Sequence, residues 1–364
     1  MARGPSKTRT AEGGGEGARR VASSPVTIKD IAAALGVSHS TVSRALNDHS
    51  HISADMKERV RRTAMELGYI AHAGARTLRQ AHGRLIGMLA PNVMNQLFAV
   101  MIKVLAARCA RAGYQLVLCV TEDDPEAELR HVEALRQSRA TGLVIVPTSG
   151  VLSKTALLMA AMPVVQFSRS HPAIAAPSVA IDGARGISNA VRHLADLGHR
   201  RIAYVGLSTG LSTGAARAAG FTEAMAQRGR PVEPGLFHHG GGTIEYARST
   251  TAALLRAKRP PTAIIYGSAD LTEGGLESLR REDVAVPAHI SIIGFGDPGW
   301  FKLMTPGLST VGLSLSESAE AAISMLLRQI EARETGSPLE PQASLELEPF
   351  LILRETTAPP RAEG

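Results

Sequence analysis

The spacing of apolar residues near the amino terminus predicts three short helices. Residues that favour helix caps precede the three runs at Thr27, Ser38 and Ser53, and Gly36 and Gly68 stand where two of the runs end. The apolar faces recur at helical intervals in Ile28, Ile31, Ala32 and Leu35, in Val42, Ala45 and Leu46, and in Met56, Val60, Ala64 and Leu67. Because a two-residue turn separates the first two runs, we expect a helix-turn-helix whose second helix is presented outward.

A different pattern begins near residue 84. Short apolar runs typical of buried parallel strands alternate there with helical stretches such as 98–112 and 126–137. The runs are 85–89, 115–120, 142–146 and 164–167, followed by 201–205, 263–266 and 291–294. Two such series predict two doubly wound α/β lobes arranged as in periplasmic binding proteins. Ligands are expected at the carboxyl ends of the strands and in the cleft between the lobes.

Composition agrees with several folded domains and places the charge in one of them. With 364 residues, 44% hydrophobic and 20% charged, the chain is neither wholly disordered nor fibrous. Residues 1–84 carry 14 Lys or Arg and 7 Asp or Glu, a net +7, whereas residues 85–364 carry 26 of each. The whole formal charge of +7 therefore lies near the amino terminus. This indicates either a module that binds a polyanion or a solvated basic face.

These patterns divide the chain into four predicted segments. Residues 1–25 form a basic arm without aromatic residues, which we expect to be disordered. Residues 26–72 form an all-α helix-turn-helix headpiece, residues 73–83 form a linker, and residues 84–364 form the α/β two-lobed body.

Cysteine content and hydropathy predict a cytoplasmic protein. Cys109 and Cys119 are too few for a disulfide framework and lie in apolar stretches, as reduced thiols do. The longest nearly uncharged stretch, 156–167, is about half the length that a membrane span needs. Arg19 and Arg20 lead into Pro25 rather than into the apolar segment of a signal peptide, so we expect no membrane association.

The polar face of the second predicted helix carries chemistry that suits DNA. Its residues are His39, Ser40, Ser43 and Arg44, whose groups bond base edges or phosphates. Taken singly, they fit an ordinary solvated helix surface. Together with the turn spacing and the local positive charge, they favour DNA binding.

The headpiece motifs resemble those of the LacI/GalR repressors. The resemblance lies in segments 26–32, 36–38 and 41–47 and in Leu67-Gly68-Tyr69. It implies that His39, Ser40 and Arg44 contact bases. The matching backbone-contacting positions are Thr27, Ser38, Thr41, Ser43, Asn47 and His51. After Tyr69 the family usually has Pro-Asn where this chain has Ala71-His72, which bears on the stiffness of that turn and not on the fold.

Residues 75–79 resemble the family's hinge helix, which orders on operator DNA. Leu78 matches a leucine that inserts between base steps from the minor groove, and the neighbouring arginines suit the negative potential of a narrowed groove. The alternative is that Leu78 ends a flexible linker.

The resemblance extends over the body, in segments 95–99, 198–206, 217–221, 290–295 and 354–360. It implies a two-lobed domain that binds a small-molecule effector and forms a homodimer. The candidate effector-binding residues are Asn95, Phe98, Ser168, Asp182, Arg217, Asp270, Asp297 and Trp300.

The effector site departs from the family's sugar-binding members at three places. Those members often have carboxylates where this chain has Ser168, Ser268-Ala269 and Gly296. Carboxylates accept charge-assisted hydrogen bonds from sugar hydroxyls, so a neutral hexose would be held poorly. The arginine at Arg217 is retained, and a guanidinium suits a carboxylate, a phosphate or a polyol. An anionic effector such as a sugar acid is therefore our hypothesis, with Trp300 either stacking on the ligand or packing on the surface.

Signals for catalysis or metal binding are weak, so we expect no enzyme, cofactor or metal. Residues 206–210 fit G-x-S-x-G, but the glycine loop at 239–242 follows Ser208, whereas in the hydrolase fold that loop precedes the nucleophile. His238 and His239 are adjacent, and no cysteine pair has ligand spacing.

The expected function is a transcriptional regulator, a repressor that binds a near-palindromic operator under the control of an effector. One short recognition helix contacts only a few base pairs, so a homodimer is needed for specificity. No tetramerisation heptad follows Pro349, which leaves the dimer as the simpler expectation. The alternatives are a free-standing protein that binds a metabolite and a hydrolase.

Overall fold

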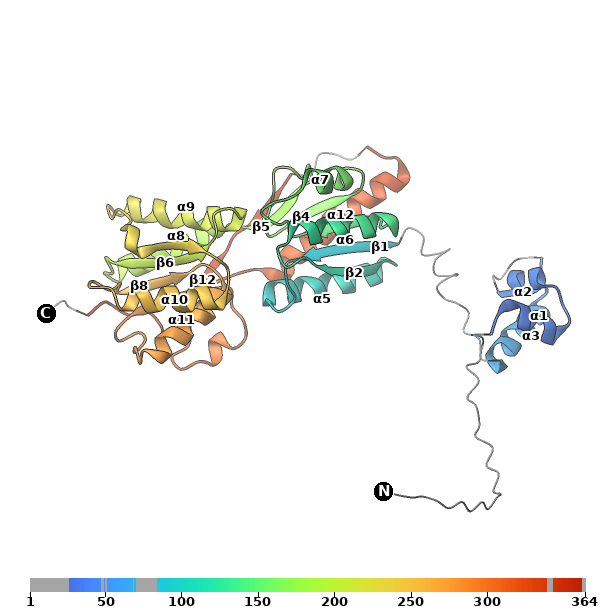
Figure 1. Ribbon diagram of the computed structural model, residues 1–364, viewed down its shortest axis with the longest axis horizontal. Helices are drawn as coiled ribbons and strands as arrows, with labels where there is room; N and C mark the ends of the chain where they lie inside the picture. Colours follow the sequence, from blue (N-terminus) through green and yellow to red (C-terminus); the bar gives the residue numbers. More distant parts are fainter. Residues whose placement is uncertain are drawn as a thin grey trace, which may run out of the picture. The chain divides into compact units, whose positions relative to one another are not determined.

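The computed structural model describes residues 26–46, 49, 51–67, 69, 84–338 and 343–361. The chain divides into two compact units between Gln80 and Ala81, the headpiece and the body (Figure 1). The predicted arm 1–25, the linker 73–83 with Leu78, Asn47 and Ala71-His72 lie outside the described residues.

The described headpiece consists of three helices around one small core. These are α1 (Ile28–Leu35), α2 (His39–Leu46) and α3 (Ala54–Glu66). Ile31, Val42, Ala45 and Val60 are fully buried where the helices meet. The predicted helix-turn-helix is confirmed.

Local chemistry sets the helix ends as the sequence predicted. The Thr27 backbone N–H and hydroxyl both donate to Asp30 Oδ2 at 2.7 Å, which lowers the pKa of Asp30. Gly36 ends α1 in the left-handed conformation at φ 63°, which glycine adopts without strain. Ser38 and Ser53 accept hydrogen bonds from the backbone N–H groups of α2 and α3.

The described part of the first lobe holds a six-stranded parallel sheet in the order β11-β5-β4-β3-β1-β2. The strands are β1 (Leu85–Ala90), β2 (Gln115–Val120), β3 (Gly142–Ile145), β4 (Val164–Phe167), β5 (Ser178–Ile181) and β11 (Leu345–Leu347). The helices are α5 (Gln96–Arg111), α6 (Pro125–Gln137), α7 (Ser153–Met159) and α12 (Leu315–Thr335). Met88 packs with α5 and α12 on one face, whereas Leu89 packs with α6 and α7 on the other. Both faces are therefore covered, as the apolar strands predicted.

The second lobe repeats this architecture. Its described strands follow the order β12-β10-β9-β8-β6-β7, and only the pairing of β12 with β10 is antiparallel among them. The strands are β6 (Ile202–Leu207), β7 (Phe237–Gly240), β8 (Ala263–Tyr266), β9 (Ser291–Phe295), β10 (Thr310–Gly312) and β12 (Phe350–Ile352). The helices are α8 (Gly183–Asp196), α9 (Ser212–Gln227), α10 (Ile244–Leu255) and α11 (Ala269–Arg281), with the 3-10 turns η1 (Pro234–Leu236) and η2 (Phe301–Leu303).

Within the described residues the chain passes between the lobes three times. The passages are from β5 to α8, from β10 to α12 and from β11 to β12 (Figure 1). They lie against one another, because Asp182 N–H donates to the Leu347 carbonyl at 2.9 Å and a Cβ on Gly186 would meet both Val311 and Pro349 within 3.2 Å. The lobes are therefore joined by a narrow hinge of adjacent segments.

Candidate DNA-binding surface and effector cavity

The polar face of α2 is exposed because the opposite face forms the headpiece core. Val42 and Ala45 are fully buried, whereas His39, Ser40 and Arg44 are exposed. A helix side so presented, with a guanidinium and hydroxyls, has the groups that bind base edges and phosphates in the major groove.

The predicted backbone-contacting residues that are described lie at the start of α2 and at other positions of the headpiece. Ser38 Oγ lies 2.8 Å from both Ser40 Oγ and Thr41 Oγ1, so these hydroxyls form one cluster at the start of α2. Thr27 is exposed, and the exposed ring of His51 lies edge-on to His49 with centroids 5.6 Å apart. Ser43 is half-buried.

A cavity of about 360 Å³ lies in the body, where strands of both sheets end. Residues that follow β1, β2, β4, β6, β7 and β8 line it, the arrangement expected of a ligand site in parallel α/β sheets. Five of the eight predicted effector residues line this cavity, namely Asn95, Phe98, Ser168, Arg217 and Asp270.

Arg217 on α9 is held tightly in the cavity wall. Its guanidinium carbon lies 3.8 Å from the ring centroid of Phe295, and Nη1 donates to the Gly267 carbonyl at 2.7 Å. Nε is buried without a hydrogen-bond partner among the described residues. Burial lowers the pKa of Arg217 to about 10. Glycine is required at Gly183, because a Cβ there would lie 2.9 Å from Arg217 Cγ.

Asn95 and Asp270 face each other from different lobes. Asn95 Nδ2 lies 3.5 Å from Asp270 Oδ2, and a second hydrogen bond, from Ser170 N–H to Ser212 Oγ at 3.0 Å, also joins the lobes. Burial raises the pKa of Asp270. The cleft is therefore bridged by two polar contacts.

An ion pair occupies the first-lobe side of the cavity. Arg169, from the loop after β4, binds both carboxylate oxygens of Asp123, with Nη2 at 3.3 Å from Oδ2. Glu122, Asp123 and Ser168 all have positive φ, between 52° and 61°. Left-handed backbone outside glycine costs free energy and gathers at functional sites, and all three of these residues line the cavity.

The other three predicted effector residues lie outside the cavity lining. Asp182 caps α8 by accepting from Arg185 N–H at 2.8 Å, and Asp297 forms a two-bond ion pair with Arg354 at 2.8 Å. Trp300 is 39% exposed and lines a separate hollow beside α11. These three side chains therefore interact with other parts of the second lobe and do not line the cavity.

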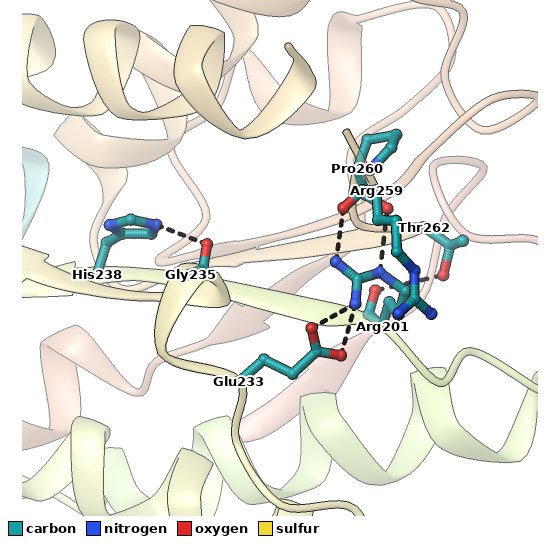
Figure 2. A network of polar contacts seen from close by, with 7 residues as sticks. All are labelled: Arg201, Glu233, Gly235, His238, Arg259, Pro260 and Thr262. Atoms are coloured by element: carbon teal, nitrogen blue, oxygen red, sulfur yellow. Dashed lines mark hydrogen bonds and ion pairs between the residues drawn. The ribbon is translucent and has the colours of Figure 1, made fainter. Parts of the chain in front are cut away.

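A second arginine of this lobe, Arg201, has a carboxylate and two backbone carbonyls as hydrogen-bond partners. Arg201 precedes β6 and donates to Glu233 Oε1 at 2.6 Å, to the Arg259 carbonyl at 2.5 Å and to the Pro260 carbonyl at 3.4 Å (Figure 2). His238 in the same view bonds the Gly235 carbonyl at 3.0 Å. Among the residues described, no group of three or more possible metal ligands was found.

Two family models match the chain. The model described as "Bacterial regulatory proteins, lacI family" matches residues 27–72, and the model "Periplasmic binding protein-like domain" matches residues 191–357. The chain therefore carries a helix-turn-helix domain of the lacI family and a periplasmic-binding-protein-like domain. It is a DNA-binding transcriptional regulator, and the predicted family and function are confirmed.

Curated relatives and a solved structure are similar to this chain over most of its length. The HTH-type transcriptional regulator DegA of Bacillus subtilis is 27% identical over 340 residues, 92% of this chain and 98% of the relative. The HTH-type transcriptional repressor PurR of Haemophilus influenzae is 28% identical and covers 91% and 98%. The crystal structure of the Lac repressor dimer bound to operator and the anti-inducer ONPF matches with a TM-score of 0.74, 24% identity and coverage of 92% and 100%.

These relatives are named as regulators and not as enzymes. In this regulator the hydroxyl of Ser208 accepts a hydrogen bond from Gly210 N–H at 3.2 Å, within its own loop. In the part of the chain that is described, no helix is long and apolar enough to cross a membrane.

Sequence reasoning missed several residues that line the cavity of this regulator. They are Asn92, Glu122, Asp123, Arg169 and Thr243. Each lies in a loop that follows a parallel strand. Examining every such loop, rather than only positions matched to the family, would have found them.

Proposed function

We propose that this regulator is a repressor that binds a near-palindromic operator as a homodimer. The observation that carries the proposal is α2, whose apolar side forms the headpiece core while His39, Ser40 and Arg44 stay exposed. One such helix contacts only a few base pairs, so two copies related by symmetry supply the specificity. The similarity to a Lac repressor dimer bound to operator supports this arrangement. Binding to operator DNA places the protein in the cytoplasm.

The proposal assigns specific contacts to the headpiece residues. Arg44, His39 and Ser40 contact base edges. The DNA backbone is contacted by Thr27, Ser38, Thr41, Ser43 and His51. On the basis of the sequence alone, Asn47 also contacts the backbone and Leu78 inserts into the minor groove.

The body senses a small molecule, a sugar, a sugar acid or a related metabolite, in the cavity between the lobes. The binding residues are Asn95, Phe98, Ser168, Arg217 and Asp270. A ligand there competes for or bridges the Asn95–Asp270 contact, so it favours one arrangement of the lobes. That difference in affinity between two lobe arrangements is what couples the cavity to operator binding.

Selection from random DNA with the full chain tests the proposal. We expect enrichment of a site with two inverted half-sites. Light scattering should give the protein a mass of twice the 38.3 kDa of one chain. Met65→Asp changes a residue of α3 that is 77% exposed, so as a control it should enrich the same site as the wild type. Failure of the wild-type chain to enrich any sequence contradicts the proposed function.

A further inference from the structure

Arg217 differs from three other little-exposed arginines of the body in lacking a counter-ion among the described residues. The side chains of Arg169, Arg201 and Arg354 are 12%, 12% and 18% exposed, and each pairs with a carboxylate. Arg217 forms no ion pair within the described residues, although burial lowers its pKa. A desolvated cation without a partner costs free energy, which an anion in the cavity would offset.

The backbone around the cavity also favours negative charge. The amino-terminal ends of α5, α9, α10 and α11 all contribute lining residues, namely Asn95, Thr213, Thr243 and Asp270. Helix amino termini carry partial positive charge and free N–H groups. Side chains cap one N–H group each of α5, α10 and α11, whereas α9, the helix that bears Arg217, has no capping side-chain hydrogen bond.

The acidic groups of the cavity do not neutralise Arg217. Asp123 is engaged by Arg169, and Glu122 is exposed. Asp270 faces Asn95, and its carboxylate accepts hydrogen bonds, as it would from a ligand hydroxyl. The cavity thus pairs a cationic site with a neutral-to-acidic polar site.

We infer that the effector is a small hydroxylated oxyanion whose carboxylate or phosphate binds Arg217 while a hydroxyl group bonds Asp270 or Asn95. This inference rests on the proposed function, since it names the ligand class of the same cavity. The volume of about 360 Å³ suits a single sugar-sized molecule. A planar guanidinium fork matches either oxyanion.

Thermal unfolding of the full chain, with inorganic phosphate as the probe, tests the cationic site. At ionic strength matched with chloride, phosphate should raise the melting temperature of the body by about 2–4 °C in the wild type. We expect the same shift in Arg256→Gln, a control at an exposed arginine paired with Glu282, and little or none in Arg217→Gln. No shift in the wild type, or equal shifts in all three proteins, overturns the inference. The wild-type result decides even if Arg217→Gln does not fold.

Calorimetry with D-glucose, D-glucuronate and D-glucose 6-phosphate then separates the oxyanions. Either anionic sugar should bind at least about tenfold more tightly than glucose, and the better of the two identifies carboxylate or phosphate. Binding of glucose as tightly as both anions overturns the inference. Enrichment of an operator by the ligand-free wild type is measured separately, so failure here leaves the proposed function standing.

Discussion

Two arginines, Arg44 in the headpiece and Arg217 in the body, show how differently the two units prepare for anionic partners. Arg44 is exposed on α2 and is the only basic residue in the last turn of that helix. Arg217 is clamped between the Phe295 ring and the Gly267 carbonyl, in a place where burial lowers its pKa. The Arg44 guanidinium is hydrated in the folded protein, whereas the Arg217 guanidinium is largely desolvated by folding.

This difference determines what each site can discriminate. An exposed cation attracts any polyanion, and its specificity comes from hydrogen bonds made after the DNA docks. A buried cation in a fixed cavity is preorganised, so it selects by shape and charge before any rearrangement. The headpiece is therefore suited to search along DNA, and the body to recognise one class of small molecule.

The largest expected effect is the loss of headpiece folding without any change in the stability of the body. Val42→Asp puts an unpaired carboxylate into the headpiece core, where Val42 is fully buried, at a cost of several kcal/mol that a three-helix core cannot offset. Operator binding should fall to background in gel-shift assays, while the thermal transition of the body is unchanged. Met65→Asp carries the same charge at an exposed position and should keep the headpiece folded. A parallel loss of body stability in Val42→Asp would contradict the independence of the units.

Salt should affect the two sites very unequally. Between 50 and 200 mM salt, operator affinity should fall by roughly 10³-fold, because counterions are released from several phosphates. The affinity of an oxyanion for the cavity should fall by less than about tenfold, because a buried cation is screened much less. Fluorescence anisotropy with labelled DNA and calorimetry with the ligand measure the two slopes. Equal slopes would show that the Arg217 site is open to solvent in solution.

Removal of one base contact has a more local effect. Arg44→Ala should cost about 1–3 kcal/mol at one base position of the operator and relax the preference there. Arg62→Ala on α3, whose partner is Glu66, is the matched control and should leave base preference intact. Repeating the selection with both variants measures this. An unchanged preference in Arg44→Ala would remove Arg44 from the base-contacting set.

The smallest expected effect concerns pH and the body alone. His199 is buried and bonded to Thr262, Ser291 and the Ala358 carbonyl, and burial lowers its pKa from 6.5. Below pH 6.5 His199 therefore takes up a proton more readily in the unfolded chain than in the folded body. The free energy of unfolding falls as the pH drops through that range. Melting curves from pH 7 to pH 5 should show a shallower slope in His199→Gln than in the wild type. His239→Gln, at an exposed position, should keep the wild-type slope.

Several elements were predictable because their signals are local. The periodicity of Ile31, Val42 and Val60 predicted the headpiece core, and runs rich in apolar residues predicted β2, β4 and β8 at the bounds observed. Strands β5, β7, β10, β11 and β12 were not predicted. They are three or four residues long, and the exposed β11 differs little from a loop in pattern. Pairing with a neighbouring strand, and not their own composition, makes them strands.

The sequence by itself determined the two kinds of domain, the confinement of the excess charge to the amino-terminal segments and the exposed polar residues of α2, because caps, periodicity and charge act between near neighbours. Only the tertiary structure decided which polar groups share the cavity. Asp123 and Arg169 meet through loops that lie far apart in sequence, and Asp297 is taken by Arg354 from the carboxyl-terminal tail. Ion pairing depends on distance in space, so long-range packing decides which charges are satisfied and leaves Arg217 without a carboxylate partner among the residues that the structure describes.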